Sequence, residues 1–251
     1  MRRPLEQVVA LGVIQGAAEL LPVSSSAHVA AIPQLLGWEI ASWPAERRKE
    51  LEVALHCGAL AALAPALWRV RPSLPVLALS LAPPVVLGYA LERPIEQRLG
   101  GPVGVASGLL LGAAALAASE CRVPHRTGKE VDARVALALG FAQAAALWPG
   151  VSRTGATLAA ARALGYTRAD ASRLSFGVAG PVLAGATALK AWRGRHAADR
   201  KLLAAGAGAA FAATRVALRV AGLQRREPLW PYAAERALLA GAILAARRRR
   251  A

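Results

Sequence analysis

The chain has 251 residues, of which 55% are hydrophobic and only 5% aromatic, and its mean hydropathy is +0.38. A soluble domain of this length needs more polar residues to cover its surface, so the composition predicts a polytopic helical membrane protein with one domain, residues 1–251. The net charge of +16 comes mostly from short Lys and Arg clusters between apolar runs. That distribution suits membrane topology and anionic headgroups, and it disfavours nucleic acid as a partner, which needs one continuous basic face.

The first apolar segment, residues 5–21, ends at Pro22 and is short for a hydrocarbon core of about 30 Å. A second short segment follows at residues 24–36. Broken backbone at membrane depth is tolerated only where it is buried in protein or lines a wet cavity, so the two segments predict a re-entrant hairpin. The same pattern recurs at residues 133–148 and 154–165.

Six full-length apolar segments predict transmembrane helices, at residues 51–68, 74–91, 103–119, 170–190, 202–221 and 229–246. The polar stretch that includes Glu46 to Glu50 is a predicted loop. A longer predicted loop, Glu120 to Asp132, divides the chain into halves at approximately 5–119 and 133–246.

The two halves share a pattern at a constant spacing. Gln15 corresponds to Gln143 and Ser24 to Ser152, and the differences 143 − 15 and 152 − 24 both equal 128. Because three spans separate the hairpins and three is odd, the second hairpin enters from the opposite face, and both broken tips can meet near the membrane centre. The predicted fold class is an all-α polytopic membrane protein, an inverted repeat with about six transmembrane helices plus two re-entrant helical hairpins.

The Lys and Arg of the predicted loops are unevenly divided between the two membrane faces. The face that carries both termini holds sixteen of them and the other face eight. The positive-inside rule therefore predicts that both termini lie in the cytoplasm.

The first break carries polar residues that are costly at membrane depth and are therefore candidate site groups: Gln15, Glu19, Ser24, Ser25, Ser26 and His28. Gln15 and Glu19 are four residues apart and share a helix face, and Ser25 and His28 are three apart on the next helix. Ser24 or Ser25 can cap that helix, whose first N–H groups favour anions. As alternatives, Glu19 could be a structural carboxylate and Ser24 a plain cap.

The second break adds a cation to the same pattern, because Arg153 follows the cap residue Ser152 and precedes Thr154 and Gly155. Two helix N-termini, a guanidinium, hydroxyls and an imidazole suit a phosphate group. Glu19 beside a phosphate then has to hold a metal ion or accept a proton. Other polar residues in apolar runs are expected mostly to pair with one another or line the rim: Glu52, His56, Arg162, Arg173, Ser175, Arg215, Arg219, Glu235 and Arg236.

Two stretches resemble the signature regions of the bacterial undecaprenyl-diphosphatase family of the bacitracin-resistance type. The first is Gln15-x-x-x-Glu19 with the run from Leu21 to His28, and the second runs from Pro149 to Thr157. The resemblance covers nearly the whole chain. It implies an integral membrane phosphatase of the bacterial cytoplasmic membrane, with inverted repeats, a divalent cation and an active cavity open to the outer side. That enzyme removes the terminal phosphate of undecaprenyl diphosphate and so recycles the lipid carrier of peptidoglycan synthesis.

Carried over by position, the resemblance implies catalytic roles for Glu19, Ser25, His28 and Arg153. From the two helix N-termini and their polar side chains we expect phosphate contacts from Ser24, Ser26, Ser152, Arg153, Thr154 and Gly155. Glu19 is the implied ligand of Mg²⁺ or Ca²⁺, with Gln15 as a tentative second ligand where the family has Glu or Gln. Ala27 departs from the family pattern by replacing the usual Gly, and Thr154 by replacing Ser.

The leading hypothesis is hydrolysis of a polyprenyl diphosphate, in which Ser25 or a water attacks phosphorus and His28 is base or proton donor. A transporter or flippase for a polyprenyl phosphate or another anion is the alternative, because paired broken helices are also a transporter pattern. A catalytically inactive homologue is a third reading, motivated by Gln15 and Ala27. The expected partners are the lipid substrate and the membrane, and a homodimer is left open.

Overall fold

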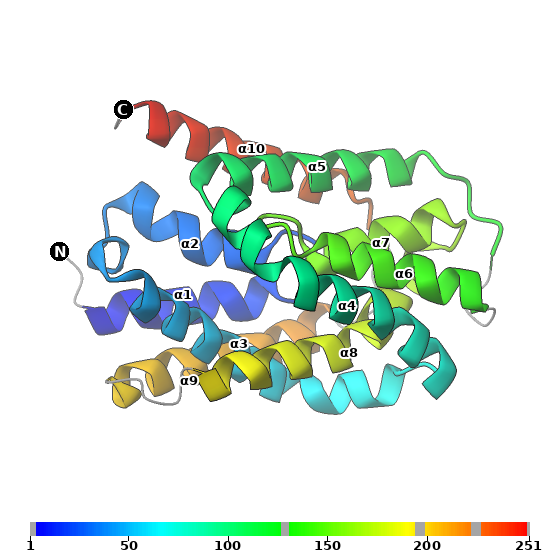
Figure 1. Cartoon of the computed structure of the whole chain (residues 1–251), viewed down its shortest axis with the longest axis horizontal. Coiled ribbons are helices and arrows are strands. Elements are labelled where there is room, and N and C mark those ends of the chain that lie inside the picture. The colour runs from blue at the N-terminus through cyan, green and yellow to red at the C-terminus, as the bar shows by residue number, and fades with distance from the viewer. Residues whose placement is uncertain (1–3, 127–130, 194–198, 222–226, 250–251) are drawn as a thin grey trace. The chain divides into compact units, whose positions relative to one another are not determined.

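The computed structural model describes residues 4–126, 131–193, 199–221 and 227–249, and they form helices joined by short turns (Figure 1). The elements are α1 (Pro4–Ala18), α2 (Ser25–Leu36), the 3₁₀ helix η1 (Glu39–Ser42), α3 (Ala45–Val70), α4 (Leu74–Leu99), α5 (Pro102–Glu120), α6 (Ala133–Ala145), α7 (Arg153–Ala163), α8 (Arg168–Arg193), α9 (Arg200–Ala221) and α10 (Trp230–Arg248). The all-α prediction is confirmed.

The first break lies between α1 and α2. Helix α1 ends at Ala18, three residues earlier than the predicted end of that segment. Pro22 explains this end, because a proline ring clashes with the carbonyl four residues before it and has no N–H to donate. Ser24 has a φ of 70°, an uncommon conformation for a residue with a side chain, and it turns the backbone into α2.

The second break lies between α6 and α7, and each of these two helices has a side-chain cap at its N-terminus. Asp132 accepts a hydrogen bond from the N–H of Val135 at the start of α6. Ser152 accepts one from the N–H of Gly155 at the start of α7, as predicted for a capping serine. Gly150 supplies a φ of 93°, which residues with a Cβ rarely adopt.

The described residues belong to two compact units. Unit 1 comprises Met1–Leu20, Ser25–Ala66 and Leu183–Gly222. In this unit α1 packs along α9 and also contacts α2 (Figure 1). Its core includes Val8, Leu11, Val29, Ile40, Trp43, Leu51, Leu55 and Ala210.

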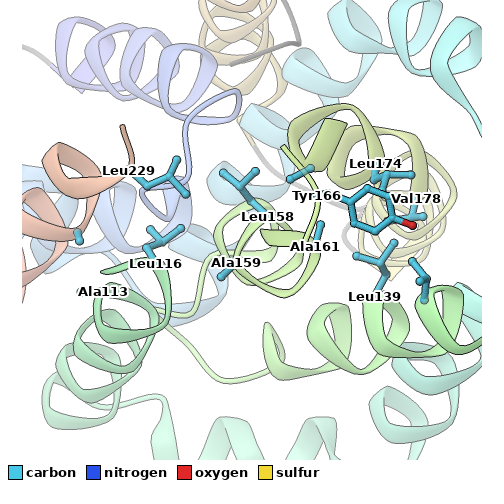
Figure 2. Packing of buried hydrophobic residues seen from close by; sticks show 13 residues of the cluster. Ala113, Leu116, Leu139, Leu158, Ala159, Ala161, Tyr166, Leu174, Val178 and Leu229 are labelled. Carbon is cyan, nitrogen blue, oxygen red and sulfur yellow. The ribbon is translucent and has the colours of Figure 1, made fainter. Parts of the chain in front are cut away.

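Unit 2 comprises Leu21–Ser24, Leu67–Val182 and Leu223–Ala251. Here α10 packs on α5, α4 on α6, and α7 on both α5 and α6. The core of unit 2 surrounds the buried side chain of Tyr166, and Figure 2 shows it with the neighbouring apolar residues Leu139, Leu174 and Val178. Each unit therefore combines helices from both halves of the sequence.

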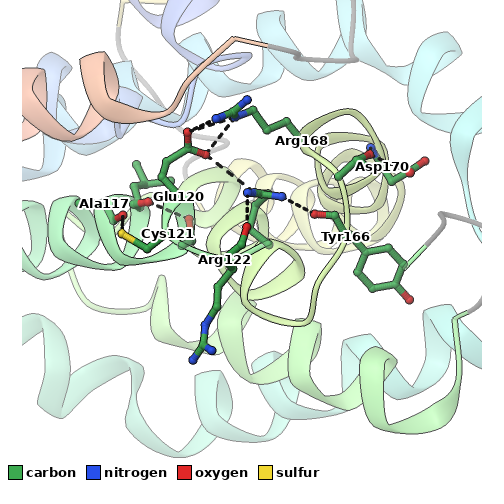
Figure 3. Close-up of polar contacts among 11 residues, drawn as sticks. Ala117, Glu120, Cys121, Arg122, Tyr166, Arg168 and Asp170 are labelled. Atoms are coloured by element: carbon green, nitrogen blue, oxygen red, sulfur yellow. Dashed lines mark hydrogen bonds and ion pairs between the residues drawn. The ribbon is translucent and has the colours of Figure 1, made fainter. Parts of the chain in front are cut away.

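A polar network in unit 2 joins the end of α5 to the turn between α7 and α8 (Figure 3). The buried carboxylate of Glu120 accepts hydrogen bonds from Nε and Nη2 of Arg168, the shortest of them 2.6 Å. These bonds raise the pKa of the Arg168 guanidinium. Arg162 adds donor bonds to the carbonyl oxygens of Tyr166, at 2.6 Å, and Arg122, at 3.0 Å. The network anchors the C-terminal end of α7.

Four helices in the described ranges are long and apolar enough to cross a membrane: Ala45–Val70, Leu74–Leu91, Pro102–Glu120 and Arg200–Val220. The predicted spans 74–91, 103–119 and 202–221 agree closely with three of them. The predicted loop at Glu46 to Glu50 is wrong, because these residues form the first turns of α3. Charged residues are good helix formers, and they extend an apolar helix where it leaves the hydrocarbon region.

The predicted orientation stays a prediction. Seven of the basic residues on which it depends lie outside the described residues: Arg2, Arg3, Lys129, Arg195, Arg225, Arg226 and Arg250.

Candidate functional site

A buried carboxylate lies at the centre of the first break. Glu19 follows α1 directly, and its N–H still bonds to the carbonyl of Gln15 at 2.9 Å, so the two side chains stay on one face. Its Oε2 accepts hydrogen bonds from Nε2 of Gln15 and from Oγ of Ser25, both at 2.8 Å. Gln15 Nε2 also lies 3.3 Å from Ser25 Oγ. The structure therefore brings together three of the predicted site residues, and a serine hydroxyl points at a carboxylate that can accept its proton.

His56 is a further polar group beside this carboxylate. Its Nε2 lies 4.0 Å from Oε2 of Glu19, and its Nδ1 lies 2.9 Å from the carbonyl of Glu52 in α3. Because a backbone carbonyl can only accept a hydrogen bond, Nδ1 donates to it, and Nε2 is the ring nitrogen that faces Glu19. The sequence analysis placed His56 only among polar residues of apolar runs, because its partner lies 37 positions away (56 − 19).

The remaining predicted residues of the first break lie on α2 or just before it. Ser26 and His28 are half-buried in the first turn of α2, and Ser25 and His28 are three residues apart on that helix, as predicted. Ser24 is buried and precedes the helix. Whether His28 and Ser26 contact a phosphate stays a prediction.

In unit 2 the second break presents the N-terminus of α7. Arg153 is its first residue and is half-buried, while Thr154 and Gly155 are buried. Ser152 caps the N–H of Gly155 at 3.1 Å. The first N–H groups of a helix and its dipole attract anions, and an arginine at the first position adds a positive charge.

Behind this turn, two hydroxyls fix α7 to α8. The hydroxyls of Thr157 and Ser175 lie 2.5 Å apart, and Ser175 also donates to the carbonyl of Thr154 at 3.2 Å. Ser175 was expected to pair with another polar residue or line the rim, and the structure shows the pairing. The first turn of α7 is therefore held from behind by α8.

Arg236 of α10 joins the two breaks inside unit 2. Its Nη1 donates to the carbonyl of Pro22 at 3.2 Å and its Nη2 to the carbonyl of Gly150 at 3.1 Å. The side chain is completely buried. Sequence analysis missed this role because 214 residues separate Arg236 from Pro22 (236 − 22), and no local spacing reports such a contact.

The donor set at the first break fits a hard divalent cation in part. Oε1 of Gln15 is buried and has no hydrogen-bond partner, which makes it an oxygen suited to a cation beside the carboxylate of Glu19. Within the described ranges, no group of three or more His, Cys, Asp or Glu side chains could hold a metal ion. Mg²⁺ commonly takes only one or two protein carboxylates and completes its shell with water and phosphate oxygens, so Glu19 and Gln15 could form the protein's part of such a site.

Together, apolar helices of membrane length, two Pro/Ser breaks, a carboxylate–hydroxyl pair and an arginine-headed helix N-terminus define an integral membrane protein that handles an anionic ligand. The chain belongs to the BacA family, because the family model described as bacitracin resistance protein BacA matches residues 8–242. It is accordingly a multi-pass membrane protein.

Curated relatives match this chain over 73% to 95% of its length. A protein of Geobacter metallireducens named undecaprenyl-diphosphatase is 36% identical over 95% of this chain and 96% of its own length. One of Geobacter sulfurreducens with the same name is 37% identical over 94% and 95%, respectively. A third protein named undecaprenyl-diphosphatase, from Pelotomaculum thermopropionicum, is 34% identical over 73% of this chain and 74% of its own length.

Proposed function

We propose that this protein hydrolyses undecaprenyl diphosphate to undecaprenyl phosphate and inorganic phosphate, and thereby recycles the lipid carrier of peptidoglycan synthesis and supports bacitracin resistance. The family match and the names of the relatives support the activity. The observation within the molecule that carries it is the hydrogen bond from Ser25 Oγ to the buried carboxylate of Glu19. Transport alone needs no nucleophile with an adjacent proton acceptor, whereas hydrolysis does.

Ser25 is the proposed attacking group, either through its own oxygen or through a water that it orients. The new bond forms between that oxygen and the terminal phosphorus, and the bond from phosphorus to the bridging oxygen breaks, so that undecaprenyl phosphate leaves. Glu19 accepts the proton of the attacking group, because Oε2 is already its hydrogen-bond acceptor at 2.8 Å. With Glu19 as acceptor, His28 takes the remaining role of proton donor to the departing oxygen. If a phosphoseryl group forms, a water releases it in a second displacement.

Arg153 and the first turn of α7 are the proposed phosphate holders. The guanidinium offers parallel donors to two phosphate oxygens, and the helix N-terminus adds N–H groups and a positive dipole end. Phosphoryl transfer is accelerated mainly by positioning and by charge stabilisation, which are the contributions that these groups can make. Ser24, Ser26, Ser152 and Thr154 are proposed to line the same phosphate.

Glu19 and the unpartnered Oε1 of Gln15 are the proposed protein ligands of Mg²⁺ or Ca²⁺. Bound there, the cation would offset the negative charge of the phosphate oxygens. The amide of Gln15 supplies one neutral ligand, so the protein contributes a single negative charge to the cation. Oxygens of the substrate phosphate would supply the other negative charges around the cation.

The proposed inverted repeat is supported by how equivalent helices pair within the units. Helix α2 begins at residue 25 and α7 at 153, and α5 begins at 102 and α10 at 230; both differences are 128. In unit 1, α1 of the first half packs on α9 of the second. In unit 2 their counterparts are paired in the opposite sense, since α6 of the second half packs on α4 of the first.

The proposed location is the bacterial cytoplasmic membrane, with both termini in the cytoplasm and the active cavity open to the outer side. The substrate's tail is too apolar to leave the bilayer, which supports a site reached from within it. The sixteen-to-eight imbalance of Lys and Arg between the two predicted membrane faces supports the orientation.

Phosphate release from undecaprenyl diphosphate by the purified protein tests the function. We expect release to depend on an added divalent cation and to fall by about 100-fold or more in Glu19→Ala and Arg153→Ala, since each removes a charge used in the transition state. Glu39→Gln and Arg247→Gln, which alter exposed residues, are the matched controls.

Unchanged activity in the triple variant Glu19→Ala, His28→Ala, Arg153→Ala would reject the assignment. Movement of lipid phosphate across proteoliposomes without phosphate release would instead support a carrier.

A further inference from the structure

Arg236 is the largest completely buried side chain of the chain's described part, and it lies on neither broken segment. A guanidinium is always charged and costly to bury, so its partners are informative. Each of its two terminal nitrogens donates to a different backbone carbonyl, of Pro22 in the first break and of Gly150 in the second. Both carbonyls are at positions where the helix has ended, so no intrahelical N–H satisfies them.

The space around the guanidinium is formed by glycines of two other helices. A methyl group at Gly155, in the first turn of α7, would lie 2.6 Å from Nη1 and 3.3 Å from the carbonyl oxygen of Pro22. A methyl group at Gly112 of α5 would overlap Nη2 and approach Nη1 to 3.0 Å. Helices α5, α7 and α10 therefore enclose one cation whose donors reach the tip of each break.

We propose that Arg236 is a positioning residue that ties the two breaks together and so fixes the segment from Pro22 to Ser24 against the first turn of α7. This inference rests on the proposed function, because it concerns the same reaction. Ser25 directly follows the tied segment and Arg153 begins the helix beside it. The tie therefore holds the backbone that leads into Ser25 beside the first turn of α7, without Arg236 touching the substrate.

If Arg236 acts through its two hydrogen bonds, its replacement by lysine should reduce activity. If only its charge matters, lysine should replace it without loss. Arg236→Met fits a similar volume and leaves both carbonyls unpaired, whereas Arg236→Lys keeps the charge but replaces the planar fork by one nitrogen. We expect kcat to fall by about 100-fold in Arg236→Met, because small misplacements of reacting groups have effects of that size, and by about tenfold in Arg236→Lys. KM should change less than threefold in both, because the groups that bind the phosphate are retained.

Gly155→Ala provides a second route to the same defect in a protein that keeps Arg236. The added methyl displaces Nη1 from the carbonyl of Pro22, so kcat should fall about tenfold. Combined with Arg236→Met it should cause almost no additional loss, because the tie is already gone. Gly241→Ala on α10, where a methyl group meets nothing within 4 Å, and Arg247→Met on the same helix are the matched controls.

Hydrogen exchange supplies a readout that does not depend on catalysis. In Arg236→Met, peptides covering residues 19–26 and 148–156 should both exchange faster, while peptides from α1 and α9 keep wild-type rates. Wild-type exchange and kcat in this variant would overturn the proposal, and so would a uniform rise in exchange across all helices, which marks a merely structural role. Wild-type kcat in Arg236→Lys, with the loss confined to Arg236→Met, would also overturn it by assigning the effect to charge. Failure of the wild-type protein to release phosphate would refute the proposed function while leaving the exchange result to decide the tie.

Discussion

At the scale of single residues, the burial of Glu19 is explained by its donors. Only 6% of this residue is exposed, and an isolated carboxylate so placed would be strongly destabilising. Gln15 and Ser25 both donate to the same oxygen, so this buried carboxylate is hydrogen-bonded within the protein. The amide of Gln15 donates a hydrogen bond to Glu19. An ionised glutamate at this position could not donate, and its carboxylate would repel that of Glu19.

Replacing Gln15 by Glu tests this account. Without a divalent cation, Gln15→Glu should be less stable than the wild type, because two carboxylates would share one buried position. A cation bound between the two carboxylates would be held more tightly than by Glu19 and an amide. Half-maximal activity of Gln15→Glu should therefore require about tenfold less Mg²⁺ than that of the wild type. Gln15→Leu should require more Mg²⁺ than the wild type. Titrations of activity and of melting temperature against Mg²⁺ measure both effects, and identical curves for wild type and Gln15→Glu would exclude Gln15 as a cation neighbour.

At the scale of helices, the sequence predicted starts better than ends. The start of α7 and its serine cap follow from the local run Pro149 to Ser152, because proline and a capping hydroxyl act on immediate neighbours. The end of α1 was placed too late, since the proline acts on the residue four positions before it. The N-terminal turns of α3 were predicted as a loop, because a run of charged residues indicates exposure to water and is compatible with either a loop or an exposed helical turn.

Two substitutions of Ser152, the cap of α7, distinguish its effect on stability from its effect on phosphate binding. Ser152→Ala should destabilise the protein by about 1 kcal/mol, since the N–H of Gly155 loses its acceptor. Ser152→Asp should keep that stability but raise KM by about tenfold or more, because an anion at the helix N-terminus competes with the phosphate. Asp132→Ala on α6 is the matched control, with a similar loss of stability and wild-type KM. Equal KM for wild type and Ser152→Asp would argue against a phosphate at this turn.

At the scale of the whole molecule, the sequence predicted the kinds of group in the site but not all of its members. Gln15, Glu19 and Ser25 lie within one short stretch, and helical spacing indicated that the first two meet. For His56 and Arg236 the sequence predicted only a polar partner or a place at the rim, since their contacts depend on how distant helices pack. The pairing of α1 with α9 and of α4 with α6 has the same origin, because a repeat in the sequence does not reveal which copies exchange partners.

The pairing of helices from the two sequence halves leads to a prediction about two equivalent glycines, Gly12 on α1 and Gly140 on α6. Their positions differ by the repeat spacing of 128 (140 − 12). A methyl group at Gly12 would lie 2.5 Å from the carbonyl oxygen of Gly206 on α9. A methyl group at Gly140 would lie 2.9 Å from the carbonyl oxygen of Ser80 on α4. Both positions therefore need glycine for the same reason, the close approach of a helix from the other half.

Alanine at either position should destabilise the protein, by about 1–3 kcal/mol for a forced separation of two packed helices. Gly208→Ala on α9, where a methyl group meets nothing within 4 Å, should be neutral or stabilising, because alanine is the better helix former. Melting temperatures of the three variants in detergent give the comparison, with losses for Gly12→Ala and Gly140→Ala and none for Gly208→Ala. A loss at only one of the two repeat positions would show that the pairs α1–α9 and α4–α6 are not equivalent, and the inverted repeat would then lose its main structural support.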